Sequence, residues 1–255
     1  MNSPAKSASR SSVITRVVRL SLAGTLLLSP AGLAQNGKKD QAKKAAPALP
    51  TVPFATDKGR FRVVVDGLPV ATDEFQISRN GSEWSARGTV DITSETGGTR
   101  ITSHLRVRND GTPVKYEVEV TPPDGKRSSV NVVFDGTTAR IETQMAGSAA
   151  FTQEFYYESP RVVILDNNLY HQYALLARMF DWKAKGAQTF QVLIPQDLTP
   201  GSITLEYVGP QTVGGSKLEA LRMKSTDLEV FLYADSNHRL MRLAVPGSKA
   251  EVIRE

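Results

Sequence analysis

The sequence predicts a mostly β protein, built as a large curled antiparallel meander sheet (an open or half barrel) with one apolar helix at about 167–183 packed across it. Three observations predict this fold. Short segments of alternating apolar and polar residues follow one another from Phe61 to the end of the chain. Pairs of turn-forming residues separate many of these segments. One stretch, residues 166–182, has the apolar spacing of a helix instead.

The clearest strand is the segment VKYEVEV at 114–120, in which apolar residues occupy the even positions and charged residues the odd ones. This period of two places one face against a core and the other in water. Asn80–Gly81 and the Asp–Gly pairs at 110–111, 124–125 and 135–136 suit tight hairpins, because these residues tolerate positive φ. Such short connections cannot cross over to a parallel strand, so the sheet is expected to be antiparallel. About twelve to fourteen strands of this kind form a sheet that tends to curl.

The segment DNNLYHQYALLARMFDW at 166–182 has two apolar stripes at helical spacing. One stripe runs through positions 169, 173, 176 and 180, and the other through 175, 179 and 182. A helix that is apolar on most sides is buried on most sides. Asp166, Asn167 or Asn168 is expected to cap its first turn by accepting a backbone N–H hydrogen bond. We therefore expect this helix to fill the concave side of the curled sheet.

The first 34 residues have the order of a secretory signal peptide. A basic start precedes an apolar run, Leu20–Leu28, and small residues at Gly32 and Ala34, so we expect cleavage after Ala34. The apolar run is too short to cross a membrane, which takes about 17–25 residues, and no later stretch is long enough, so no transmembrane segment is expected. Residues 35–52 are predicted to be a disordered linker of Lys, Ala and Pro, and residues 53–255 a single β-rich domain.

The cysteine and charge content exclude several classes of protein. The chain has no cysteine, which removes disulfides, thiolate metal sites and cysteine nucleophiles. Export without disulfides favours a bacterial protein that is periplasmic or secreted. The net charge of +5 belongs to the leader and linker, because residues 51–255 carry 23 basic and 25 acidic side chains. A domain without a basic excess is not expected to bind nucleic acid.

His171, in the helical segment, is the one candidate for a catalytic residue. A general base needs a nucleophile or an oriented water within about 3 Å, and a partner that fixes its tautomer. The nearest carboxylates in the sequence, Asp166 and Asp181, have no recognised catalytic spacing from it. A histidine hydrogen-bonded at the edge of the helix is therefore the favoured interpretation. His104 and His238 are isolated as well, and no metal site or cofactor is expected.

An exported, cysteine-free antiparallel sheet that curls around one apolar helix resembles the lipoprotein-carrier superfamily of LolA/LolB-like half-barrels. It is also similar to uncharacterised exported bacterial β-domains of the same build. The resemblance covers about residues 55–255, with DNNLYHQYALLARMFD as the helical insert and RLMRLAVPGSKAEVIRE as the end of the chain. No residue motif of the carriers is matched, so no functional residue is carried over. The resemblance implies an apolar concavity for lipid or acyl chains.

Two functions remain open at this point. The favoured one is a non-enzymatic exported envelope protein that binds an apolar small molecule or lipid, or an envelope protein partner, in the concavity of the sheet. The residues expected to line this concavity from the helix side are Tyr170, Tyr173, Met179 and Trp182. Close packing of the same side chains would instead fill the concavity. The alternative function is a hydrolase, or a hydrolase-accessory domain, that uses His171 with a nearby carboxylate.

Overall fold

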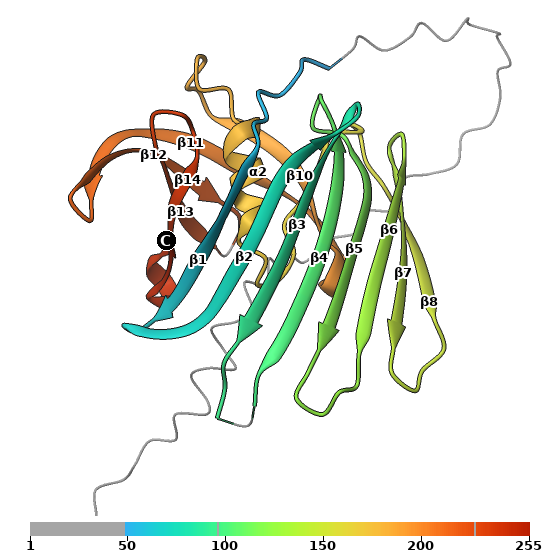
Figure 1. Cartoon of the computed structure of the whole chain (residues 1–255). Coiled ribbons are helices and arrows are strands. Elements are labelled where there is room, and N and C mark those ends of the chain that lie inside the picture. The colour runs from blue at the N-terminus through green and yellow to red at the C-terminus, as the bar shows by residue number, and fades with distance from the viewer. Residues whose placement is uncertain (1–48, 96, 227) are drawn as a thin grey trace, which may run out of the picture.

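The computed structural model describes residues 49–95, 97–226 and 228–255 (Figure 1). The predicted signal peptide, residues 1–34, and most of the predicted linker lie outside the described residues. The last four linker residues, 49–52, are described and contact the domain. The backbone N–H of Val52 donates to the carbonyl of Asn109 at 2.7 Å, and the Arg161 guanidinium donates to the carbonyl of Pro50 at 2.6 Å.

The described residues form one sheet of 15 strands, in the order β8-β7-β6-β5-β4-β3-β2-β1-β15-β14-β13-β12-β11-β10-β9. The first eight strands are β1 (Asp57–Val65), β2 (Leu68–Asn80), β3 (Glu83–Ile92), β4 (Thr99–Arg108), β5 (Pro113–Thr121), β6 (Ser128–Asp135), β7 (Thr138–Met145) and β8 (Phe151–Tyr156). The others are β9 (Val162–Ile164), β10 (Gln188–Ile194), β11 (Thr199–Val213), β12 (Ser216–Lys224), β13 (Glu229–Ala234), β14 (Leu240–Val245) and β15 (Ala250–Arg254). Two short 3₁₀ helices, η1 (Pro195–Asp197) and η2 (Pro246–Ser248), follow β10 and β14.

The sheet consists of two meanders joined where β1 pairs with β15. Every strand pair is antiparallel except β9 with β10, which is parallel. At the join, the Arg254 guanidinium forms two hydrogen bonds with the Asp57 carboxylate, at 2.5 and 3.1 Å, and both side chains are nearly buried. Bidentate pairs of this kind are strong and geometrically specific. They fix the place where the two ends of the domain meet.

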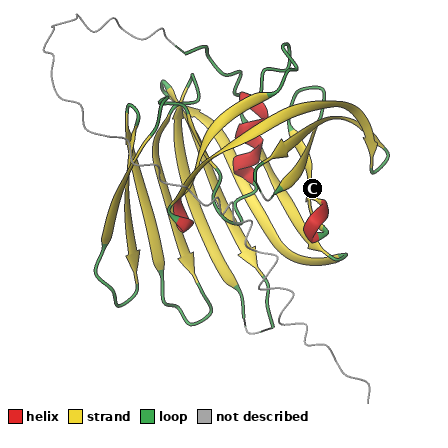
Figure 2. Cartoon of the chain, turned by 180° about the vertical axis from the view of Figure 1, so that it is seen from behind, coloured by secondary structure: helices red, strands yellow, loops and turns green. Residues whose placement is uncertain are grey.

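The sheet is curled but not closed (Figures 1 and 2). Register shifts in the β1–β2, β4–β5, β11–β12 and β13–β14 pairs add local twist, which bends the strands. The β9 end is turned inward, where β9 contacts β5 and η1 contacts β6. The β8 end forms the outer margin. The prediction of a large curled antiparallel sheet in the form of an open half barrel is confirmed.

The helix α2 (His171–Met179) lies on the concave side, as Figure 2 shows from behind, and contacts β3, β13 and β14. It is shorter than the expected 167–183, because residues 165–170 form a buried loop before it and an extended residue, Phe180, ends it. Leu169, Leu176 and Phe180 are at most 2% exposed, so both ends of the expected apolar stripe are in the core. Among the described residues, no helix combines the length and the apolar character needed to cross a membrane.

Candidate functional site

His171, the first residue of α2, is bound to the sheet through Asp73 of β2. One carboxylate oxygen of Asp73 accepts the backbone N–H of His171 at 2.9 Å, and both oxygens lie 3.0 Å from its Nδ1. The two side chains are 0% exposed. The first N–H groups of a helix have no partner within the helix, and here a carboxylate 98 residues away in the sequence satisfies one of them. The expectation of a cap from Asp166, Asn167 or Asn168 is therefore wrong, because the helix begins after this loop.

The other ring nitrogen of His171 faces the hydroxyl of Ser103 on β4, with a distance of 3.2 Å between Nε2 and Oγ. Because a carboxylate only accepts hydrogen bonds, Nδ1 carries a hydrogen, and Nε2 is within hydrogen-bond distance of the hydroxyl. The ring lies directly on Gly88 of β3, where a Cβ atom would come within 2.1 Å of its Cε1. Phe75 stacks on the ring at 6.1 Å between centroids. Three neighbouring strands thus hold the imidazole in one orientation.

A second buried carboxylate, Asp166, fixes the loop before the helix. It accepts hydrogen bonds from the Tyr116 hydroxyl at 2.6 Å and from the backbone N–H groups of Asn167 and Gln196, both at 3.0 Å. Burial raises the pKa of the Asp166 carboxyl from its usual 3.8 to about 6, although these hydrogen bonds act in the opposite direction. Burial, followed by the charge and hydrogen bond of Asp166, also raises the pKa of Tyr116 well above its usual 10.

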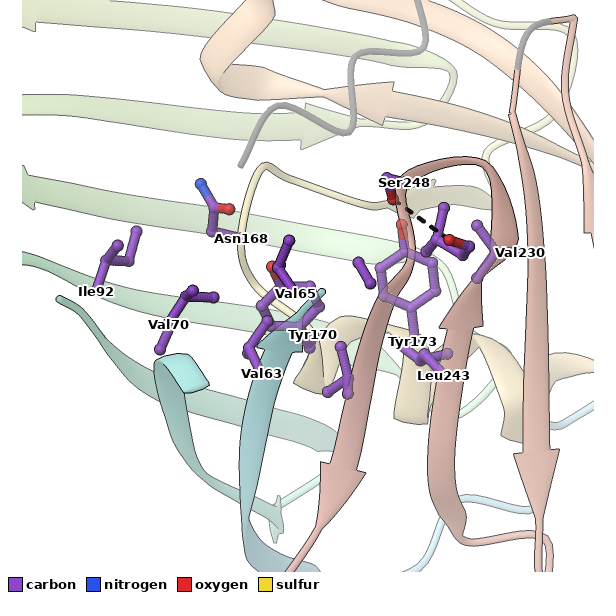
Figure 3. Close-up of a pocket in the computed structure, with 14 residues that line it drawn as sticks. Val63, Val65, Val70, Ile92, Asn168, Tyr170, Tyr173, Val230, Leu243 and Ser248 are labelled. Carbon is purple, nitrogen blue, oxygen red and sulfur yellow. Dashed lines mark hydrogen bonds between the residues drawn. The ribbon is translucent and has the colours of Figure 1, made fainter. Parts of the chain in front are cut away.

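Tyr170 and Tyr173, two of the expected lining residues, are 6% and 4% exposed and border one small enclosed cavity (Figure 3). Figure 3 shows Tyr170 beside Val63 and Val65 of β1, and Tyr173 near Leu243 of β14. The cavity offers about 20 Å³ to the centre of a water molecule. A volume of this size accommodates about one water molecule and no acyl chain.

Met179 and Trp182, the other two expected lining residues, border a larger groove beyond the C-terminal end of α2. The groove has a volume of about 990 Å³. Its apolar walls come from α2 and the residues after it, from β10 and from the 49–53 segment: Pro50, Val52, Met179, Phe180, Trp182 and Phe190. Its polar margin includes the side chains of Glu158, Arg161, Lys183 and Gln191. We call this space the helix-end groove.

Trp182 is held rigidly at one wall of the helix-end groove. Its indole N–H donates to the carbonyl of Ala177 at 2.9 Å, and its ring stacks on His238 at 4.4 Å with an interplanar angle of 2°. Burial, and then the positive charge of Arg178, lower the pKa of His238 below its usual 6.5, so the stacked imidazole is neutral at pH 7. The groove therefore presents a preformed aromatic surface whose orientation does not depend on a ligand.

The structure divides the four expected lining residues between two spaces, and it gives His171 a carboxylate that sequence spacing did not identify. Asp166 and Asp181, its neighbours in sequence, serve the loops on either side of the helix instead. The alternation of apolar and polar residues along β2 already marked Asp73 as unusual. In TDEFQIS at 72–78, position 73 shares a strand face with Phe75 and Ile77, so a carboxylate stands on the apolar face. Ser103 of β4 is likewise a polar residue on an apolar strand face, between Ile101 and Leu105.

The remaining histidine, His104, lies on the outer face of the sheet. Its Nε2 is 2.9 Å from the Ser85 hydroxyl, and Glu117 lies 3.8 Å from Nδ1. In the part of the chain that the structure describes, no three His, Asp or Glu side chains are grouped in a way that could hold a metal ion.

Comparisons with known proteins show similarity in fold alone. No protein-family model matches the chain, and no curated protein matches it. Among solved structures, the chain is similar to a beta-barrel-like protein of the domain of unknown function DUF1849 from Brucella abortus. The TM-score is 0.53 and the identity 7%, over 80% of this chain and 96% of that one. A DUF1089 family protein from Pseudomonas aeruginosa has a TM-score of 0.42 and 12% identity, over 88% of this chain and 98% of that one.

The first of these neighbours is described as beta-barrel-like, in agreement with the curled, unclosed sheet of this chain. It is not described as a lipoprotein carrier, and the resemblance to LolA/LolB-like proteins stays a prediction.

The contact between Gly88 and His171 predicts that Gly88→Ala destabilises the protein by about 1–3 kcal/mol or more, because the clamped ring has no room to yield to a methyl group. Gly186→Ala is the matched control, since its Cβ would meet nothing within 4 Å. Urea unfolding followed by circular dichroism measures both variants. Equal stability of the two would show that the ring does not lie on Gly88.

The raised pKa of Asp166 predicts a specific dependence of stability on pH. Between pH 6 and 4 the folded state takes up a proton at Asp166 that the unfolded state does not, so the contribution of this group to the free energy of unfolding falls as the pH rises through this range. The total decrease in the free energy of unfolding from this group is up to about 3 kcal/mol. Asp166→Asn cannot titrate. We therefore expect the stability of the wild type relative to this variant to decrease between pH 4 and pH 7 in urea unfolding, and a difference independent of pH would contradict the assignment.

Proposed function

We propose that this protein is a non-enzymatic, exported protein of the bacterial envelope that binds an apolar ligand, a lipid or another acyl compound, in the helix-end groove. The observation that carries the proposal is the groove itself. Its volume of about 990 Å³ is at the upper end of the range of about 300–1,000 Å³ for ligand sites. Aromatic and methionine side chains with a few polar groups at the margin are the lining that such ligands need.

The available space favours a ligand site at the C-terminal end of α2 rather than between α2 and the sheet. The side of α2 that carries Tyr170 and Tyr173 faces a space of one water molecule, whereas Met179 and Trp182 border the open groove. The apolar concavity that a LolA/LolB-like carrier would use is thus largely filled by the helix. The ligand site proposed here lies at the end of that helix. A peptide segment of an envelope partner is the other occupant with suitable chemistry.

Export to the periplasm, or secretion, is part of the same proposal and rests on the first 34 residues. A basic start, a short apolar run and small residues before Gln35 are the features of a cleavable signal. We expect the protein isolated from its own cell envelope to begin at Gln35. N-terminal sequencing or intact mass measurement tests this, and an envelope protein that retains Met1 would contradict it.

A hydrolase is the second candidate, and one observation favours it. Ser103, His171 and Asp73 follow the order hydroxyl, imidazole, carboxylate, with heavy-atom distances of 3.2 and 3.0 Å. The same arrangement activates a serine nucleophile in known hydrolases. Burial weighs against it, because His171 and Asp73 are 0% exposed and Ser103 is only 7% exposed. The binding role is therefore the better supported of the two.

Titration with a fluorescent fatty acid tests the binding role. We expect saturable binding that Trp182→Glu weakens at least tenfold, because a carboxylate on the wall of the groove opposes an apolar ligand. Trp182→Phe, which keeps an aromatic wall, is expected to retain most of the affinity. Leu68→Glu, at a side chain that is 59% exposed outside the groove, is the matched control and is expected to bind like the wild type.

Two outcomes of this titration would contradict the proposal. One is no saturable binding of fatty acids or phospholipids by the folded wild type. The other is equal loss in Trp182→Glu and Leu68→Glu. Hydrolysis of a short-chain ester that Ser103→Ala abolishes would favour the hydrolase instead.

A further inference from the structure

The strand β8 (Phe151–Tyr156) is the outer margin of the sheet (Figure 1). In the part of the chain that the structure describes, it pairs with β7 on one side and with no strand on the other. An edge strand presents a row of backbone N–H and C=O groups that a further strand can use. The opposite margin differs, because β9 has only three residues and all of them are buried.

The sequence of β8, FTQEFY, has one charged side chain, Glu154, and lacks the other features that usually protect an edge strand. It contains no proline and no lysine, and its pairing with β7 runs from Thr138–Tyr156 to Thr143–Phe151 without a register shift. Proteins commonly protect such edges with proline, lysine or a β-bulge. The edge of β8 therefore has the geometry of a regular strand that is ready to pair.

Exposed apolar side chains gather at the same margin. In the described residues, four of the six large apolar side chains that are exposed lie on β6, β7 and β8: Val133, Met145, Phe151 and Tyr156. Met145 and Phe151 are 58% and 53% exposed. They share the inner face of the sheet with the buried Ile141, because side chains two residues apart, and those directly opposite on paired strands, point to the same face. Of the four, Met145 and Phe151 therefore extend the apolar inner face to the free edge, whereas Val133 and Tyr156 point to the outer face.

We infer that β8 pairs antiparallel with β8 of a second copy of this chain, with Gln153 opposite Gln153 on a two-fold axis. This interaction surface is independent of the ligand proposed for the helix-end groove. The two copies would extend their sheets into each other by isologous strand addition.

The register follows from the side-chain pattern. Phe151, Gln153 and Phe155 are on the inner face, since they lie opposite Thr143, Ile141 and Ala139. An antiparallel pair keeps inner residues opposite inner residues only when the axis passes through a residue. The axis at Gln153 places each Phe151 opposite Phe155 of the second copy, and each Thr152 opposite Glu154.

The neighbouring registers are poorer. An axis at Glu154 puts two carboxylates directly opposite each other, and like charges at such positions destabilise a strand pair. An axis at Thr152 carries the pairing past the beginning of β8 at Phe151. One pair of short strands buries less than a standard interface of about 1,600 Å², so the association is weak and depends on concentration.

Single-cysteine variants test the pairing and its register, because the chain has no cysteine of its own. In Gln153→Cys, the two sulfurs come from residues directly opposite each other, where Cα atoms are about 4.5–5.5 Å apart and a disulfide can form. Tyr156→Cys is the matched control on the same strand. It is more exposed, at 76%, yet in this register it lies about 20 Å along the strand from its equivalent. Under mild oxidation, we expect Gln153→Cys to form a covalent dimer at least tenfold faster than Tyr156→Cys.

Sedimentation of the wild type provides a second measurement that needs no cysteine. We expect the mass to rise towards that of a dimer as the concentration approaches about 1 mM, the range of weak complexes. Phe151→Lys should abolish this rise, whereas Leu68→Lys, at an equally exposed apolar residue on another hairpin, should preserve it. Circular dichroism checks that both variants are folded.

Three results would overturn the inference. The first is a monomeric mass at every concentration together with equal crosslinking of the two cysteine variants. The second is a dimer that crosslinks through Tyr156→Cys and not through Gln153→Cys. The third is a monomer in which the β8 amides are all protected from hydrogen exchange, which would assign the edge to another segment of the same chain.

Discussion

The contact between Asp73 and His171 is the interaction on which the rest of the structure depends. One carboxylate on the inner face of β2 satisfies a free N–H at the start of α2 and also binds the imidazole of the same residue. Removing one partner of such a buried pair leaves the other without compensation, at a cost of about 3–5 kcal/mol. Phe75 stacks on Phe61 and on the His171 ring, and the Arg254 guanidinium at the β1–β15 join lies over both Phe61 and Phe75. The position of the helix and the β1–β15 join are therefore linked through contacting side chains.

The fixed position of the helix determines which part of the concave face is filled. With its first residue tied to β2 and the loop before it held by Asp166 and Tyr116, α2 fills the middle of the concave face and leaves a cavity for about one water molecule. A larger groove borders the end of the helix, between Trp182, β10 and the 49–53 segment. The same polar contacts that resemble a catalytic arrangement thus hold the helix in place, and the groove that we propose as the ligand site lies at the far end of the helix.

Most of the fold could be predicted from the sequence, and the candidate site only in part. The alternation of apolar and polar residues and the pairs of turn residues predicted the strands, and the apolar stripes predicted the helix. The first four residues of the expected helix, 167–170, form a buried loop instead. The sequence predicts Tyr170, Tyr173, Met179 and Trp182 as one lining, but the structure separates them, because the first two lie near the start of the helix beside the small cavity and the last two at its end beside the groove. Asp73 and Ser103 were missed as partners of His171. Their signal was a polar residue on an apolar strand face, and such a residue does not name its partner.

The sequence by itself determined the apolar–polar period of each segment, the antiparallel hairpins and the apolar character of the helix, because these depend on residues close together in the chain. Only the tertiary structure decided that β1 pairs with β15, that β9 runs parallel to β10, and that Asp73 meets His171 across 98 residues. The physical reason is that pairing between distant strands is set by the curl of the whole sheet and by the packing of its concave face. No local pattern of residues encodes that geometry.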